Sequence, residues 1–200
     1  MGQLALDQVV HSIRSMGLKV SPPKTEALFF HDASRGRPPR LKLRIGGISL
    51  RVDTKMKYLG LTLDGAWGFE KHFEVLTPKL NRMAGALGAL LPNVAKGPKR
   101  RARRLFANVV HSVALYGAPI WAGEMAGSRR IQQMVRRAQR FLATRLVRAY
   151  MTTSQAAATA LAGIPPVELL AMMYAEKSAY WGAPSGDQQR DGTGQGHSPR

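Results

Sequence analysis

The sequence contains no cysteine among its 200 residues, and this absence excludes disulfide bonds, a cysteine nucleophile and cysteine-ligated zinc. It also agrees with a reducing compartment. No apolar run approaches the roughly 20 residues that a membrane-spanning helix requires. The first residues, MGQLALDQ, lack the basic and then apolar regions of a secretory signal, so we do not expect secretion.

Acidic residues are scarce as well. Twelve Asp and Glu stand against thirty Lys and Arg, which gives a formal net charge of +18 and a sequence pI near 11.2. Self-repulsion of this size weakens a compact state, and a polyanionic partner would relieve it. Nucleic acid is the first partner that this charge indicates, and an anionic membrane surface is the second.

The twelve Asp and Glu residues are scattered along the sequence and do not form the closely spaced carboxylate pairs that two-metal polymerases and nucleases require. The five histidines have no metal-ligand spacing, and no GxSxG, SxxK, P-loop or dinucleotide motif is present. Glu70 and Glu74 are interpreted as a solvated first turn of a helix. His111 lies beside an apolar stripe and is interpreted as a packing residue. We therefore predict no metal site or cofactor in this chain and no self-sufficient enzyme.

The first third of the chain alternates between polar and apolar residues in the manner of strands. Residues 4–16 form an amphipathic helix ending at Gly17, and residues 26–30 read as a short strand. The segments 41–45 and 48–52 flank Gly46-Gly47 and predict a hairpin with a tight primed turn. Residues 57–64 alternate again and predict a further strand that meets this hairpin.

From about residue 69 the period becomes helical. The predicted helices span 69–90, 98–115, 129–150, 153–162 and 166–181, separated by Leu91-Pro92, Gly117–Pro119 and Gly163–Pro166. The last residues are mainly Gly, Ser, Gln and Asp, which predicts a disordered tail. The fold class is α+β, with a small antiparallel β unit over 1–66, a helical bundle over 67–182 and a tail over 183–200.

Basic residues are concentrated in two of these helices. Between Val94 and Tyr150 there are thirteen Lys or Arg and a single acid, Glu124. The first cluster occupies the first turns of its helix, where cations oppose the helix dipole: Lys99, Arg100, Arg101, Arg103 and Arg104. The second lies away from the apolar stripe of its helix: Arg129, Arg130, Arg136, Arg137, Arg140, Arg145 and Arg148. We predict phosphate contact without base readout, a solvated basic face being the alternative.

Several motifs follow one another in an order that resembles the reverse transcriptases of non-LTR retrotransposons, especially the type-1 elements that insert into ribosomal DNA. The motifs, in chain order, are GLKVSPPKTE (17–26), YLGLTLD (58–64), WGFEKH (67–72), YGAPIW (116–121), QR (139–140), AYMTTS (149–154) and LAGIPP (161–166). Met151 departs from the pattern, because the family usually has arginine there.

The resemblance implies a palm edge with a primer-grip hairpin, followed by a helical thumb. In the family the metal-binding aspartates of a YADD-like turn lie just upstream of this region, so we expect a fragment that begins after the catalytic centre and is inactive alone. The parent protein would be an RNA-directed DNA polymerase that uses Mg²⁺, with an endonuclease elsewhere in the polyprotein. Its partners would be an RNA template, a DNA primer and the rest of the Pol polyprotein, in the nucleus and without a membrane.

The resemblance also assigns roles to residues. Lys24 matches a lysine proposed to protonate departing pyrophosphate, although it could equally only neutralise phosphate. Tyr58, Leu59 and Gly60 would hold the primer terminus; ordinary strand core is the alternative for Tyr58 and Leu59. The residues expected to contact the nucleic-acid backbone are Lys99, Arg100, Arg101, Arg103, Arg104, Arg136, Arg137 and Arg140.

Two other functions stay open at this point. A non-catalytic helical nucleic-acid-binding module would share the charge but would not depend on the β unit. A peripheral membrane protein would prefer anionic vesicles to heteroduplex at equal salt.

Overall fold

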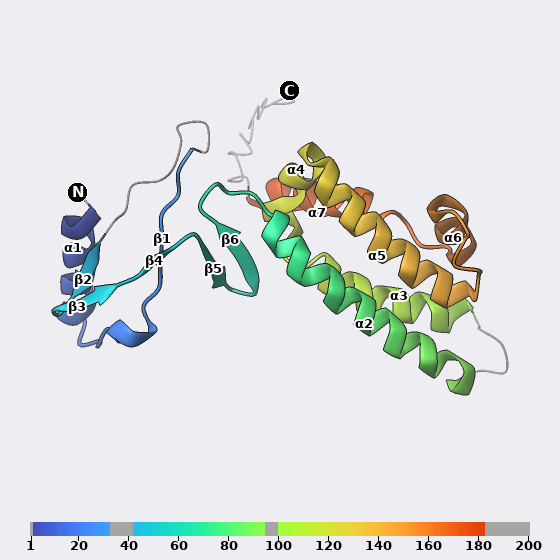
Figure 1. Cartoon of the computed structure of the whole chain (residues 1–200), viewed down its shortest axis with the longest axis horizontal. Helices are drawn as coiled ribbons and strands as arrows, with labels where there is room; N and C mark the ends of the chain where they lie inside the picture. The colour runs from blue at the N-terminus through green and yellow to red at the C-terminus, as the bar shows by residue number, and fades with distance from the viewer. Residues whose placement is uncertain (1, 33–41, 95–99, 183–200) are drawn as a thin grey trace, which may run out of the picture.

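The computed structural model describes residues 2–32, 42–94 and 100–182. Within them a small unit of short strands and one helix is followed along the chain by a bundle of helices (Figure 1). The predicted α+β class is confirmed. The predicted tail, residues 183–200, lies outside the described residues.

The N-terminal unit is built on the hairpin that the sequence predicts. β2 (Leu43–Ile45) and β3 (Ile48–Leu50) pair antiparallel, with Ile45 opposite Ile48. Gly46 and Gly47 form the turn with φ of 55° and 85°, the positive values that a primed turn requires. α1 (Gly2–Ser15) packs on this hairpin, and a small core of Val10, Ile45 and Leu50 joins them.

A second pair of strands departs from the antiparallel prediction. β1 (Ala27–Leu28) pairs in parallel with β4 (Val52–Asp53). The connection between them contains the β2–β3 hairpin, which gives the chain the length that a parallel crossover needs. A 3₁₀ turn, η1 (Pro22–Lys24), precedes β1.

The third pair corrects the prediction of a single strand over 57–64. β5 (Lys55–Tyr58) and β6 (Leu61–Asp64) form their own antiparallel hairpin, with Tyr58 opposite Leu61, and they do not pair with the β2–β3 hairpin. Leu59 and Gly60 make its turn at φ of 46° and 86°. A leucine seldom adopts a positive φ, so the alternation of the sequence concealed the turn.

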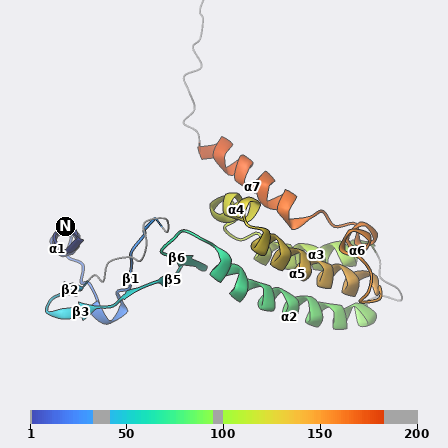
Figure 2. The same ribbon diagram turned by 45° about the horizontal axis from the view of Figure 1, so that its top comes forward.

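Among the described residues the bundle contains six helices: α2 (Glu70–Val94), α3 (Arg100–Ala114), α4 (Ala118–Gly127), α5 (Arg129–Val147), α6 (Gln155–Ala162) and α7 (Val167–Gly182). α5 lies between α2 and α6 (Figure 1). α7 packs against α4 and then runs away from the other helices (Figure 2).

In the bundle, one predicted helix boundary was wrong and one helix was not predicted. Leu91-Pro92 does not end α2, which continues to Val94 because proline removes only one backbone hydrogen bond in the last turn. α4 was not predicted at all. Its buried residues, Ala118, Trp121, Ala122 and Met125, do lie on one face of the helix, but the exposed positions between them are mostly apolar or glycine, so the sequence shows little contrast between a polar and an apolar face.

The bundle core is continuous with the β5–β6 hairpin. Leu61 of β6 is 4% exposed and belongs to the same cluster of buried side chains as Phe73, Trp121 and Leu142. The rings of Phe73 and Trp121 meet edge to face with centroids 5.0 Å apart. This hairpin therefore completes the core of the helices.

We predict opposite effects of one substitution at two glycines of this region. Gly117 has a φ of 70°, and a Cβ added there would lie 2.8 Å from Leu61 Cδ2. Gly117→Ala should therefore lower the free energy of unfolding by about 1–3 kcal/mol. Gly123 lies inside α4 with nothing near its Cβ position, so Gly123→Ala should raise it by roughly 0.5–1 kcal/mol. Urea denaturation measures both, and equal effects would contradict the close approach at Gly117.

Candidate nucleic-acid interface

The tip of the β5–β6 hairpin is held against the helices by Tyr116. The Tyr116 hydroxyl donates a hydrogen bond of 2.7 Å to the carbonyl oxygen of Leu59. A Cβ at Gly60 would lie only 3.1 Å from the Tyr116 ring, so glycine permits this approach. Trp121 Nε1 in turn donates to the Tyr116 carbonyl at 3.0 Å. The YLG and YGAPIW motifs, 57 residues apart in sequence, thus meet in space.

The other end of the hairpin is tied to the start of α2. Asp64 Oδ1 accepts hydrogen bonds from the backbone N–H groups of Ala66 and Gly68, at 3.1 and 2.8 Å. The backbone N–H of Thr62 donates to His72 Nδ1 at 3.3 Å. Two more motif residues, Asp64 and His72, therefore serve to fix the hairpin relative to the bundle.

An open groove of about 340 Å³ lies where the hairpin meets α2 and α3. It is lined by Lys57, Gly60, His72, Leu76, Lys79, Ser112, Val113 and Tyr116. Beside it, the side chains of Tyr58 and Leu59 are 56% and 72% exposed. This exposure excludes the alternative that these two residues are ordinary strand core.

The groove contains two cations that the sequence did not single out, Lys57 and Lys79. The side chains of both lysines are exposed, and neither forms a hydrogen bond or an ion pair within the described part of the chain. Lys57 directly precedes the YLG motif, and this position could have identified it as a candidate from the sequence. Lys79 lies on a helix of mixed charge, where nothing in the sequence distinguishes it from other surface lysines.

Three arginines of α5, namely Arg130, Arg136 and Arg140, have partners within the protein itself. Arg130 forms ion pairs with Glu70 at 3.1 Å and Glu74 at 2.8 Å. Arg136 Nε lies 2.7 Å from Glu168 Oε1. Glu70 and Glu74 are therefore a partly solvated start of α2, as predicted, and they also connect α2 to α5.

Arg140 has backbone partners as well. Its Nε donates to the Thr153 carbonyl at 2.8 Å, and a second guanidinium nitrogen donates to the Met151 carbonyl. The neighbouring Gln139 donates to the Pro165 carbonyl at 2.6 Å. The contact at Met151 uses its backbone oxygen, so it does not depend on which side chain stands there.

The other residues predicted to contact the nucleic-acid backbone fall into three groups. Arg101, Arg104 and Arg137 are exposed and have no ion pair or hydrogen bond among the described residues. Arg103 is half-buried, with Nε unpartnered in the described structure. Lys99 lies outside the described residues, as does the side chain of Arg100.

Lys24 is placed apart from these groups. It is exposed at the end of η1, and no hydrogen bond or ion pair in the described regions joins it to the groove. The structure therefore gives no contact that would bring Lys24 to the hairpin tip.

Two histidines are buried in the bundle. Burial lowers the pKa of His72 and of His111 below the ordinary value of 6.5. Nε2 of each ring has no partner in the described structure. The placement of His111 as a packing residue is confirmed, since it is only 7% exposed.

The pKa of Glu74 is also lowered, first by its hydrogen bond from Lys71 and further by the charges of Lys71 and Arg130. The carboxylate is therefore ionised and holds its two cations over a wide pH range.

Two searches bear on other kinds of site. Over residues 2–32, 42–94 and 100–182 there is no group of three or more His, Asp or Glu side chains that could hold a metal ion. Within the same residues no single helix has the length and apolar composition needed to cross a membrane, and only two sharply bent helix pairs reach them together.

Comparison with known proteins finds relatives among retrotransposon proteins. The chain is 28% identical over 178 residues to a 115 kDa protein in the type-1 retrotransposable element R1DM of Drosophila melanogaster. It is 25% identical over 181 residues to the retrovirus-related Pol polyprotein from type-1 retrotransposable element R1 4 of Nasonia vitripennis. It is 30% identical over 124 residues to a "probable RNA-directed DNA polymerase from transposon BS" of Drosophila melanogaster.

These alignments cover most of the chain but a minor part of each relative. They span 85%, 83% and 62% of the chain, and 17%, 45% and 14% of the respective relatives. No family model matches the chain, and no solved structure matches it significantly.

We predict that the buried histidines make stability depend on pH. Their pKa values are lower in the folded protein than in the unfolded chain, so the unfolded state binds protons first as the pH falls below 6.5. The stability contributed by the neutral rings is complete above about pH 7 and is lost as the pH falls toward the folded values. His111→Gln should reduce the loss measured by urea denaturation between about pH 7.5 and 5.5.

The matched control is His11→Gln, whose side chain is exposed on α1. This variant should show the same pH dependence as the unaltered protein. An unchanged pH dependence in His111→Gln would show that burial of His111 does not set it.

Proposed function

We propose that this chain belongs to a non-LTR retrotransposon reverse transcriptase and holds the template–primer duplex there, which its similarity to proteins of type-1 retrotransposable elements and of transposon BS supports. In this proposal residues 1–66 are the edge of the palm, residues 67–182 are the thumb and residues 183–200 are a tail. The complete protein would synthesise DNA on an RNA template in the nucleus.

The observation that carries this proposal is the groove beside the docked hairpin. Tyr58, Leu59 and Gly60 form an exposed turn at its edge, and Tyr116 holds the tip of this turn through the Leu59 carbonyl. Gly60 has no side chain, so a sugar or phosphate can approach the backbone closely. Lys57 and Lys79 supply positive charge to the groove for the phosphates of the primer strand.

The unpaired cations of α3 extend this surface. Arg101 and Arg104 are exposed on the helix that forms one wall of the groove. Arg137 of α5 is also unpaired, whereas Arg136 and Arg140 are assigned to holding α5 against α7 and the segment before α6. Backbone contact of this kind follows the shape and charge of a duplex and carries no sequence information.

Catalysis is assigned to the complete protein, with Mg²⁺ supplying the charge stabilisation of nucleotide transfer. The described residues do not fit a magnesium site, because they contain no cluster of three suitable ligands. We therefore assign no step through Mg²⁺ to this chain, which would be inactive alone. Lys24 remains a proposed proton donor to pyrophosphate, in contact with groups from the rest of the Pol polyprotein.

We predict that the groove lysines determine part of the salt dependence of binding. Each phosphate neutralised contributes about 0.9 to the slope of log affinity against log salt. The double variant Lys57→Gln/Lys79→Gln should therefore lower the magnitude of this slope by about 1–2. Fluorescence anisotropy with a DNA primer annealed to an RNA template gives the slope.

The control double variant is Lys19→Gln/Lys177→Gln, which removes the same charge from exposed positions outside the groove. Its slope should stay close to that of the unaltered protein. Equal slopes for the two double variants would contradict a site in the groove, and stronger binding to anionic vesicles than to the duplex at equal salt would favour a membrane surface instead.

A further inference from the structure

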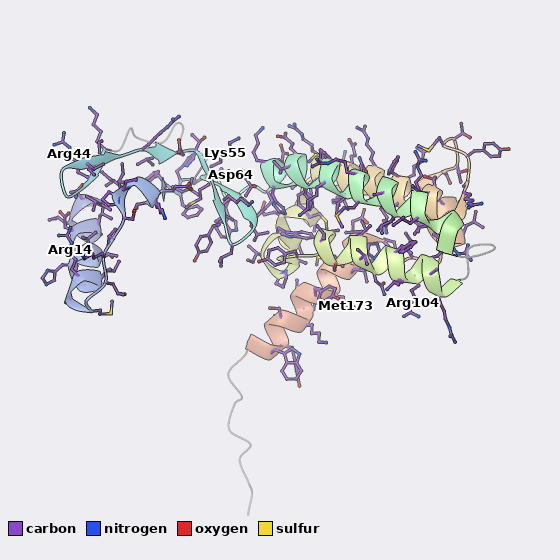
Figure 3. All side chains as sticks on the ribbon, turned by 90° about the horizontal axis from the view of Figure 1, so that it is seen from below. Arg14, Arg44, Lys55, Asp64, Arg104 and Met173 are labelled. Carbon is purple, nitrogen blue, oxygen red and sulfur yellow. The ribbon has the colours of Figure 1, made fainter. Side chains whose placement is uncertain are left out.

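A second, larger opening lies on the other side of α3. It is a cleft of about 700 Å³ between α3, the loop that follows α6, and α7. Its lining is Arg104, Ala107, Asn108, His111, Ser112, Leu115, Gly163, Ile164, Pro165, Leu170 and Tyr174. Figure 3 labels Arg104 on α3, which lines the cleft, and Met173 on α7, the helix that carries the lining residue Tyr174. Contact with the sugar–phosphate backbone of a duplex does not require such a cleft.

The wall formed by α3 is polar. Arg104, Asn108, His111 and Ser112 follow at helical spacing and share one face of α3. Arg104 has no acidic partner within the described residues, and no carboxylate lines the cleft. His111 is 7% exposed, and its Nε2 has no partner in the described structure. This nitrogen is enclosed by the protein, so the polar side chains of this wall that a ligand can reach are Arg104, Asn108 and Ser112.

The opposite wall is apolar and aromatic. Tyr174 of α7 is 46% exposed, and Ile164, Pro165 and Leu170 form the surface beside it. A partly exposed ring next to a cation and hydrogen-bonding side chains is the combination with which proteins hold unpaired bases. The volume lies in the range of about 300–1,000 Å³ that small ligands occupy in proteins.

The cleft also adjoins the groove proposed for the primer. Ser112 lines both openings, so a strand held in the groove can continue across α3 into the cleft. No acidic side chain lines either opening, so no carboxylate in their linings would repel the phosphates of a strand that passes from one to the other.

We propose that this cleft binds one unpaired nucleotide of a single-stranded segment, with its base stacked on Tyr174 and its phosphate paired with Arg104. The exposed Asn108 hydrogen-bonds the base or the sugar. The proposal rests on the proposed function, since it adds a single-strand site to the surface that holds the duplex. A chain with both sites would distinguish the paired and unpaired parts of its nucleic acid.

Fluorescence anisotropy of the full chain with a short oligouridylate and with a blunt RNA–DNA duplex tests this site. Tyr174→Ala should weaken binding of the single strand about tenfold, within the range known for loss of one stacked base, and leave duplex binding unchanged. Tyr174→Phe should retain most of the affinity, because the ring remains. Tyr180→Ala is the matched control, since this exposed tyrosine of α7 does not line the cleft, and it should change neither affinity.

A second readout is photocrosslinking with 5-iodouridine in the oligonucleotide. Crosslinks that map to Tyr174 and disappear in Tyr174→Ala support the site, whereas crosslinks confined to Tyr180 or Trp181 overturn it. Equal single-strand affinity of Tyr174→Ala and Tyr180→Ala also overturns the site. If the duplex is still bound in a salt-dependent manner in that case, only the cleft site fails and the proposed function stands. Failure of the unaltered chain to bind either oligonucleotide would overturn the proposed function and this site together.

Discussion

The structure depends on the docking of one short hairpin onto the helical bundle. Leu61 of β6 enters the same core as Phe73 and Trp121, and Gly117 makes room for it by having no side chain. Tyr116 then fixes the hairpin tip through the Leu59 carbonyl. Burial of a leucine contributes about 1.5–3 kcal/mol, more than the roughly 0.5–1.5 kcal/mol of the hydrogen bond. Packing therefore holds the hairpin in place, while the hydrogen bond sets its position.

This docking explains why residues of the motifs serve the fold as well as the site. Asp64 and His72 tie the hairpin to α2, and Gln139 and Arg140 tie α5 to the loops on either side of α6. Arg130 and Arg136 of α5 likewise connect this helix to α2 and α7. Cations without a partner among the described residues include Lys57 and Lys79 beside the groove and Arg101 and Arg104 on α3, the helix that the groove and the cleft share.

The sequence predicted what local patterns determine. The β2–β3 hairpin followed from Gly46-Gly47, because such a turn needs positive φ at both positions. The β5–β6 turn was missed because Leu59 is an unusual residue there, and α4 was missed because its exposed positions are mostly apolar or glycine, which leaves no polar face for the pattern to show. Charge density predicted a basic surface. It could not show that Arg136 and Arg140 have partners, since these contacts lie 32 and 11–13 residues away.

Native-state hydrogen exchange is the most direct test of the docking. If the hairpin completes the bundle core, the protected amides of β5–β6, including Thr62 bonded to His72, should exchange with the same opening free energy as the core amides of α2 and α5. Hairpin amides that exchange orders of magnitude faster than those helices would contradict the account, because the groove would then have no fixed wall.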